Sequence, residues 1–251
     1  LGAGLALFGI VRRTISRAGL AARVGPAALP LALACALLWV LHPLQTESVT
    51  YVVQRAESLM GLCYLLALYG FVRGLDDPHP RRWFVVAWLA CLGGMASKEV
   101  MVSAPVMVLL YDRTFVSGSL RAAWRRHRRL HLCLGATWLL LAVLVADTHG
   151  RGGSAGFDAA GVRPYLLTQC RAIMHYLRLA IWPANLLFDY GTALVRHPDE
   201  VLGQAAGVVM LLGGTFYALR RHAATGFLAL WFFVLLAPSS SFLPIVTEPM
   251  A

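Results

Sequence analysis

Residues 58–72 read SLMGLCYLLALYGFV, a run without charged side chains, and Arg73, Asp76, Asp77 and Pro78 follow it closely. An apolar run that ends in a charged, proline-containing turn is typical of a membrane-spanning helix and the loop after it. The same pattern recurs along the chain. It predicts eight such segments, at residues 1–11, 26–41, 58–72, 83–96, 100–111, 130–146, 201–219 and 223–238. We therefore expect an all-α, polytopic helical membrane protein.

The composition excludes several other classes of protein. The chain has 251 residues, of which 59% are hydrophobic and 14% are charged, and its mean hydropathy is +0.66. Soluble domains carry about 25% charged residues, so a disordered chain, a coiled coil and an ordinary cytosolic domain are excluded. Five cysteines are scattered, four of them inside apolar runs. They predict neither a disulfide framework nor a metal cluster.

The net charge of +10 comes from many arginines and a single lysine, Lys98. These residues lie between apolar stretches and do not form one amphipathic surface, so nucleic acid is not an expected partner. Basic loops beside apolar helices instead predict contact with anionic membrane lipids. The abundance of Arg over Lys, with much Ala, Leu and Gly, also favours a bacterial origin and an inner-membrane location.

The arginine-rich connections indicate how the segments alternate across the membrane. Cytoplasmic loops carry an excess of Lys and Arg, which places residues 12–23, 73–82 and 112–129 and the pair Arg220–Arg221 inside. The remaining basic residues are dispersed over the outer connections. This arrangement predicts that the polar residues near positions 42–57 and 97–99 face the periplasm.

Two segments are assigned by the same rule. Residues 83–111 are predicted to form a hairpin with Lys98 and Glu99 at its outer tip, because one long helix would move residues 112–129 outside. Residues 165–184 place Arg171, His175 and other polar side chains among Leu, Ile and Tyr. We expect this segment to be an amphipathic helix in the outer interface rather than a span.

The connection between residues 41 and 58 holds most of the candidate site residues. If residues 46–57 are helical, Glu47, Tyr51 and Arg55 share one face, and Arg suits a phosphate because its planar fork donates two hydrogen bonds at once. The alternative is that Glu47 and Arg55 are solvated boundary charges and that Glu57 caps the next helix. Lys98 and Glu99 similarly form either a site or a water-exposed tip.

Other charged groups are interpreted structurally. The pair Asp76–Asp77 is predicted to end a helix, and the run from Arg125 to Arg129 is predicted to fix the topology. The chain contains no P-loop, HExxH or CxxC pattern. No metal site is predicted, and the need for a divalent metal stays open.

The residues His42-Pro43-Leu44-Gln45-Thr46-Glu47-Ser48-Val49, followed by Arg55-Ala56-Glu57, resemble a signature of the transmembrane and tetratricopeptide-repeat-containing O-mannosyltransferases. Further matches in the same order are Ser97-Lys98-Glu99, Leu110-Tyr111-Asp112-Arg113, Phe188-Asp189-Tyr190 and Pro238-Ser239-Ser240-Ser241-Phe242 with Glu248. The resemblance implies a bacterial relative of this family with a GT-C-type bundle. It also implies tetratricopeptide repeats beyond the C-terminal end, so that residues 1–251 are an internal fragment of one transmembrane domain.

The resemblance implies transfer of a sugar, mannose, from a polyprenyl-phosphate carrier to a protein or other hydroxyl acceptor on the outer side of the membrane. The catalytic carboxylate is expected upstream of Leu1. The candidates to bind the donor phosphate are His42, Arg55 and Lys98. The candidates to orient these cations or bind the sugar are Glu47, Glu57, Glu99 and Asp189.

Three other functions stay open at this stage. A ligase or polymerase of lipid-linked glycans would use similar chemistry. A transporter would use Lys98 and Glu99 as a coupled ion site, although no internal repeat of the kind that transporters often show is present. A non-catalytic membrane anchor for a repeat scaffold would lack the upstream carboxylate.

Overall fold

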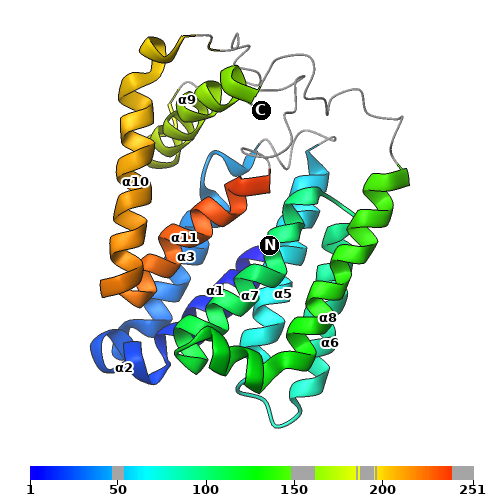
Figure 1. Ribbon diagram of the computed structural model, residues 1–251. Helices are drawn as coiled ribbons and strands as arrows, with labels where there is room; N and C mark the ends of the chain where they lie inside the picture. The colour runs from blue at the N-terminus through cyan, green and yellow to red at the C-terminus, as the bar shows by residue number, and fades with distance from the viewer. Residues whose placement is uncertain (47–53, 148–161, 185, 187–194, 196, 239–251) are drawn as a thin grey trace. The chain divides into compact units, whose positions relative to one another are not determined.

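The computed structural model describes residues 1–46, 54–147, 162–184, 186, 195 and 197–238. Within these residues every regular element is a helix, so the all-α prediction is confirmed. The chain divides into unit 1, Leu1–Asp147, and unit 2, Thr148–Ala251. Figure 1 shows the helices of each unit.

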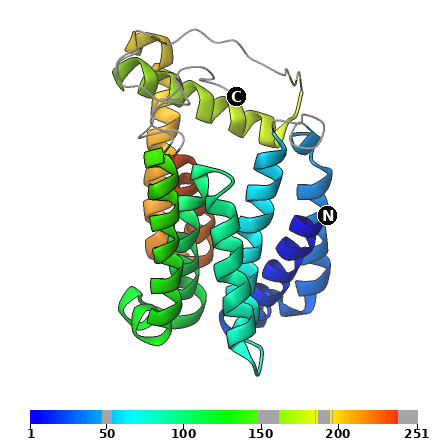
Figure 2. The ribbon, with the colours of Figure 1, turned by 90° about the vertical axis from the view of Figure 1, so that its right-hand side faces the viewer.

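The main helices of unit 1 run side by side in both views (Figures 1 and 2). Helix α1 packs on α3 and α5, α5 packs on α6 and α7, and α8 packs on α6 and α7. Their bounds are α1 Gly2–Ile15, α3 Ala28–Leu41, α5 Arg55–Gly74, α6 Pro80–Met95, α7 Ala104–Asp112 and α8 Leu120–Asp147. Most of each predicted apolar run in this part of the chain lies in one of these helices.

Helices α5 and α6 approach each other closely at Gly70. A methyl group on Gly70 would lie 2.7 Å from the carbonyl oxygen of Trp83 and 2.9 Å from the backbone nitrogen of Ala87. Only a residue without a side chain fits there. Around this contact the core contains large buried side chains, among them Leu68, Phe71 and Tyr111, which stabilise the bundle through dispersion and burial of apolar surface.

Two connections that the sequence predicts as loops are partly helical. Helix α1 continues to Ile15, and a short helix α2 covers Ala18–Val24. Arg12 and Arg13 occupy the last turn of α1, where cations interact favourably with the helix dipole. Most of residues 112–129 also belong to helices, because α8 begins at Leu120 and buries Ala123 against the bundle.

The predicted break between residues 83–96 and 100–111 is confirmed. Helix α6 ends at Met95, and the backbone N–H groups of Ser97 and Lys98 both donate to the carbonyl oxygen of Gly94. A 3₁₀ segment η2, Glu99–Ser103, then leads into α7. Lys98 and Glu99 therefore lie at a turn between two helices, as expected.

The connections of unit 1 gather at two ends of the bundle. Gly4 of α1 packs against Val40 near the end of α3, and Gly2 packs against Leu62 in the first half of α5. The other end of α1 lies near the end of α5, where Arg17 contacts Asp76. The arginine-rich connections therefore share one end, as the topology prediction requires, and the assignment of each end to a side of the membrane stays a prediction.

Unit 2 consists of α9 Val162–Ile181, the 3₁₀ segment η4 Pro198–Val201, α10 Leu202–Arg221 and α11 Ala223–Ala237. Helices α9 and α11 both pack on α10. The buried residues Tyr165, Thr168, Ala172 and Leu179 follow one face of α9, whereas Arg178 is exposed. The amphipathic character predicted for residues 165–184 is thus confirmed, and the position of α9 in a membrane interface stays a prediction.

Three described helical stretches are long and apolar enough to cross a membrane: Arg55–Gly74, Glu99–Ser117 and Pro198–Arg221. The stretches Gly25–Leu41 and Ala223–Ala237 are apolar but shorter. Large apolar side chains such as Leu38, Leu139 and Met210 are mostly exposed on the helix surfaces, as expected where lipid replaces water. This is the fold of an all-α helical membrane protein; the number of eight spans and the GT-C-type bundle stay predictions.

Candidate functional site

The two candidate residues that the structure brings together are Lys98 and Glu57. The Lys98 ammonium group forms an ion pair with the Glu57 carboxylate, although the two residues are 41 positions apart. Glu57 lies in the first turn of α5, where the positive end of the helix dipole favours a carboxylate. The side chains of Lys98 and Glu57 remain 36% and 41% exposed. The pair is therefore accessible to a ligand.

Neighbouring hydrogen bonds fix the backbone that carries Lys98. The Ser103 hydroxyl, in η2, lies 3.2 Å from the Tyr64 hydroxyl of α5 and donates to the Val100 carbonyl at 2.8 Å. The indole N–H of Trp138, in α8, donates to the Val102 carbonyl at 3.0 Å. The turn is thus held by hydrogen bonds to both α5 and α8. These contacts restrict the positions that the Lys98 ammonium group can occupy.

The other predicted cations are distributed around the same end of unit 1. Arg55 is the first residue of α5 and is exposed. It lies two positions before Glu57, so the two side chains point to different faces of the helix. His42 follows the last residue of α3, and its Nδ1 accepts a hydrogen bond of 3.3 Å from the Leu44 N–H. Glu99 begins η2 and is exposed.

Two of the predicted site residues, Glu47 and Asp189, lie outside the described residues. The proposed helical face of Glu47, Tyr51 and Arg55 is likewise outside them except for Arg55. These three points therefore stay predictions from the sequence.

At the opposite end of unit 1, Asp76 and Asp77 form the helix-ending turn that the sequence predicts. Asp76 pairs with Arg17 at 3.2 Å and with Arg13 at 3.7 Å. Asp77 accepts hydrogen bonds from the His79 N–H at 2.9 Å and the Trp83 indole at 3.0 Å. These donors hold the pKa of Asp77 below its usual value. The acidic pair therefore forms the turn after α5, and Asp76 links this turn to the arginines at the end of α1.

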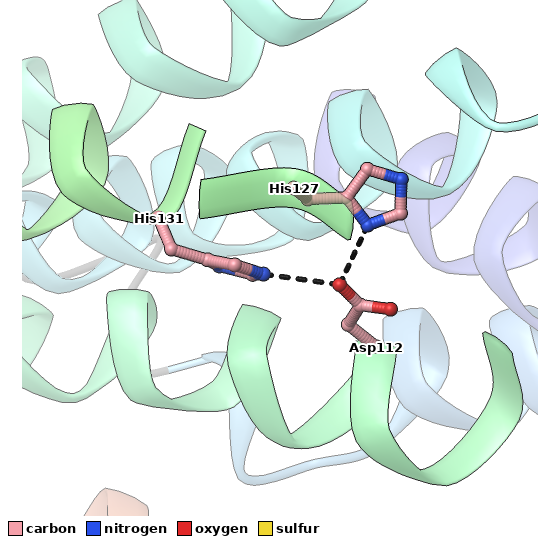
Figure 3. Close-up of side chains that lie close together, drawn as sticks. All are labelled: Asp112, His127 and His131. Carbon is pink, nitrogen blue, oxygen red and sulfur yellow. Dashed lines mark hydrogen bonds and ion pairs between the residues drawn. The ribbon is translucent and has the colours of Figure 1, made fainter. Parts of the chain in front are cut away.

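A second polar cluster lies at this end and is absent from the sequence predictions (Figure 3). The Oδ2 atom of Asp112 lies 2.7 Å from Nδ1 of His127 and 3.0 Å from Nε2 of His131. The Ser117 hydroxyl donates to Oδ1 of Asp112 at 2.7 Å. Asp112 is wholly buried and His131 is 6% exposed. We call Asp112, His127 and His131 the DHH cluster; their ligand atoms lie within 4.8 Å of one another.

The sequence contains only part of the signal for this cluster. His127 and His131 are four positions apart, a spacing that places two side chains on one face of a helix. The surrounding arginines, however, favour interpreting residues 125–129 as a topology determinant. Asp112 is 15 and 19 residues away from the two histidines, and no local pattern connects them.

Two curated proteins of Drosophila melanogaster are similar to this chain. Protein O-mannosyl-transferase Tmtc2 is 29% identical over 210 residues, which cover 77% of this chain and 22% of that protein. Protein O-mannosyl-transferase Tmtc3 is 33% identical over 108 residues, which cover 41% of this chain and 11% of that protein. The aligned part of this chain thus spans at most about a fifth of the length of these relatives. No family profile and no solved structure matches the chain.

The similarity to Tmtc2 and Tmtc3 confirms the resemblance that the signature beginning at His42 suggests, while the bacterial origin stays a prediction. Both relatives carry the same activity in their names, and the longer alignment covers most of the present residues. The chain is thus a distant relative of the Tmtc family of protein O-mannosyl-transferases.

Proposed function

We propose that this chain is part of a membrane glycosyltransferase that moves mannose from a polyprenyl-phosphate carrier to a hydroxyl group of an acceptor protein. The observation that carries this proposal is the similarity to Tmtc2 over 77% of the chain. The helical membrane-protein fold supports it, because a polyprenyl carrier is itself confined to the membrane. We further propose that the end of unit 1 that holds Lys98 and Glu57 faces the periplasm of a bacterial inner membrane.

The Lys98–Glu57 pair supports a donor site at this end. When a sugar is transferred, the polyprenyl phosphate leaves with additional negative charge, and a nearby cation stabilises that charge. Lys98 carries the only ammonium side chain in the sequence. Glu57 keeps this ammonium in place before the donor binds, and the partial exposure of both side chains allows a phosphate to replace the carboxylate.

Arg55 and His42 supply further positive charge and hydrogen-bond donors to the carrier phosphate in this proposal. Glu99, Glu47 and Asp189 orient these groups or bind sugar hydroxyls. The attacking hydroxyl of Ser or Thr loses its proton to a carboxylate upstream of Leu1. Its oxygen bonds to the anomeric carbon while the bond from that carbon to the phosphate oxygen breaks, so the configuration of the sugar is inverted.

The test uses the full-length protein in membranes with radiolabelled polyprenyl-phosphate mannose, and it counts label on acceptor protein. Lys98→Ala and Arg55→Ala should each reduce transfer at least about tenfold, or about 1.4 kcal/mol in the barrier. Arg82→Ala is the matched control, because Arg82 is an exposed cation in α6 at the opposite end of unit 1. It should leave transfer unchanged.

The outcome separates the alternative functions. Transfer that depends on Lys98 and Arg55 but not on Arg82 supports the enzyme and its donor site. Absence of transfer from mannose and from a panel of other polyprenyl-phosphate sugars would contradict the proposal and favour the repeat-scaffold anchor or the transporter. Equal transfer by all variants would remove Lys98 and Arg55 from the site.

A further inference from the structure

The backbone is distorted at three places around the DHH cluster. Residues Arg113–Ser117 form a π-helical segment, η3, directly after Asp112. Gly118 then adopts φ +74°, a left-handed conformation that favours glycine. Helix α8 has a kink at His127, with φ −121° and ψ 26°. Segments of π-helix often occur at functional sites, and here the π-helical segment follows Asp112 directly and the kink lies at His127.

The chemistry of the cluster matches a transition-metal site. Two imidazole nitrogens and one carboxylate oxygen are a common ligand set for Zn²⁺ and related divalent ions, with a fourth position open for water. Metal–ligand distances in such sites are about 2.0–2.2 Å. The ligand atoms already lie within 4.8 Å of one another.

The surroundings of the cluster also fit a metal site. Ser117 orients the Asp112 carboxylate through Oδ1, as hydrogen bonds to ligating carboxylates do. The rings of Phe71 and Trp124 lie 5.5 Å and 6.3 Å from those of His127 and His131, which limits access of water.

We propose that Asp112, His127 and His131 bind a divalent transition-metal ion, with Zn²⁺ as the reference ion. The ligand atoms are a carboxylate oxygen of Asp112, Nδ1 of His127 and Nε2 of His131. The site stabilises the junction between α7 and α8, and it lies at the opposite end of unit 1 from Lys98. The nearby arginines of α8, Arg125, Arg126, Arg128 and Arg129, are exposed, so solvent screens their repulsion of the ion.

This site is separate from the proposed donor site, and its test does not use transfer activity. The full-length protein is purified with a tag that contains no histidine, stripped with a chelator and titrated with Zn²⁺ against a chromophoric competitor. The wild type should bind one Zn²⁺ per chain at this site. His127→Asn and His131→Gln should each abolish that binding or weaken it more than about 100-fold, beyond the effect of removing an outer-shell partner.

Two further variants make the assignment specific. Ser117→Ala should keep the ligands but weaken binding by about 10- to 100-fold, because it removes the hydrogen bond that orients the carboxylate. His79→Gln should bind Zn²⁺ like the wild type, because His79 is exposed and outside the cluster. Replacement of Zn²⁺ by Co²⁺ should give a visible spectrum without thiolate charge-transfer bands, which excludes binding by the five cysteines.

The proposal is overturned if the wild type binds no Zn²⁺ at micromolar free metal. It is also overturned if His127→Asn and His131→Gln bind as tightly as His79→Gln, which would show that the DHH cluster is a hydrogen-bond network only. If the histidine variants do not fold, Ser117→Ala and the Co²⁺ spectrum of the wild type decide between these two outcomes.

Discussion

The two ends of unit 1 place a carboxylate and its partners in very different surroundings. At one end Glu57 faces Lys98, and both side chains are more than a third exposed. At the other end Asp112 is wholly buried, contacts His127 and His131, and accepts a hydrogen bond from Ser117. The Glu57 carboxylate therefore belongs to an accessible ion pair, whereas the Asp112 carboxylate belongs to an enclosed cluster.

The difference in exposure indicates whether each carboxylate contributes mainly to ligand binding or to stability. An exposed ion pair adds about 0–1 kcal/mol to stability, because water and ions screen it, so the Lys98–Glu57 pair is free to exchange partners during binding. A buried carboxylate loses its hydration and depends on every protein partner. We therefore expect changes at Glu57 and Lys98 to affect function, and changes at Asp112 to affect the fold first.

The largest expected effect is on stability at the buried end. Asp112→Ala should lower the free energy of unfolding by about 3–5 kcal/mol, because it leaves the buried His131 and the half-buried His127 and Ser117 without their acceptor. Chemical or thermal unfolding in detergent measures this. Asp76→Ala at the same end is the control and should cost about 0–1 kcal/mol, since Asp76 is 41% exposed. If the two variants lost the same free energy of unfolding, burial would not explain how much each carboxylate contributes to stability.

The next largest effect is expected on sugar transfer when Lys98 is changed. Lys98→Arg should retain more transfer than Lys98→Ala, because arginine keeps the charge and can bind both Glu57 and a phosphate. Both variants should unfold within about 1 kcal/mol of the wild type. Transfer assays and unfolding curves on the same preparations measure the two quantities. A stability loss that parallels the activity loss would show that Lys98 acts through the fold.

A smaller effect is expected at the hydrogen bond between Thr14 and Tyr111, whose hydroxyl groups lie 2.6 Å apart near the enclosed end. Tyr111 is buried, so Thr14→Val should cost about 1 kcal/mol. A double-mutant cycle with Tyr111→Phe measures the coupling between the two hydroxyls. Strict additivity of the two single changes would contradict a direct interaction.

The smallest effect concerns pH at the turn after α5. The hydrogen bonds from His79 and Trp83 lower the pKa of Asp77, so the folded state favours the ionised carboxylate. This contribution to stability is complete above the pKa of about 3.9 in the unfolded chain. It is lost as the pH falls through the lower pKa of the folded chain. Below about pH 4, the free energy of unfolding of Asp77→Asn should fall less with decreasing pH than that of the wild type. An equal fall in both proteins would contradict the assignment of this pH dependence to Asp77.

Several features of the fold follow from local sequence. The apolar runs at residues 26–41, 58–72 and 201–219 all lie in helices, because a backbone without water must satisfy its hydrogen bonds internally. The turn at residues 96–98 was predictable from the charges of residues 112–129 through the topology rule. The helical start of α8 was not, because its arginines resemble those of a loop and the buried Ala123 gives no distinct signal.

The sequence by itself determined that this is an all-α membrane protein, that its arginine-rich connections lie on one side, and that Lys98 and Glu57 are candidate site residues. Only the tertiary structure decided that Lys98 contacts Glu57 and that Asp112 meets His127 and His131. The physical reason is the range of the interactions. Helix formation depends on side chains a few positions apart, whereas these contacts depend on which helices pack together and how each is rotated about its axis.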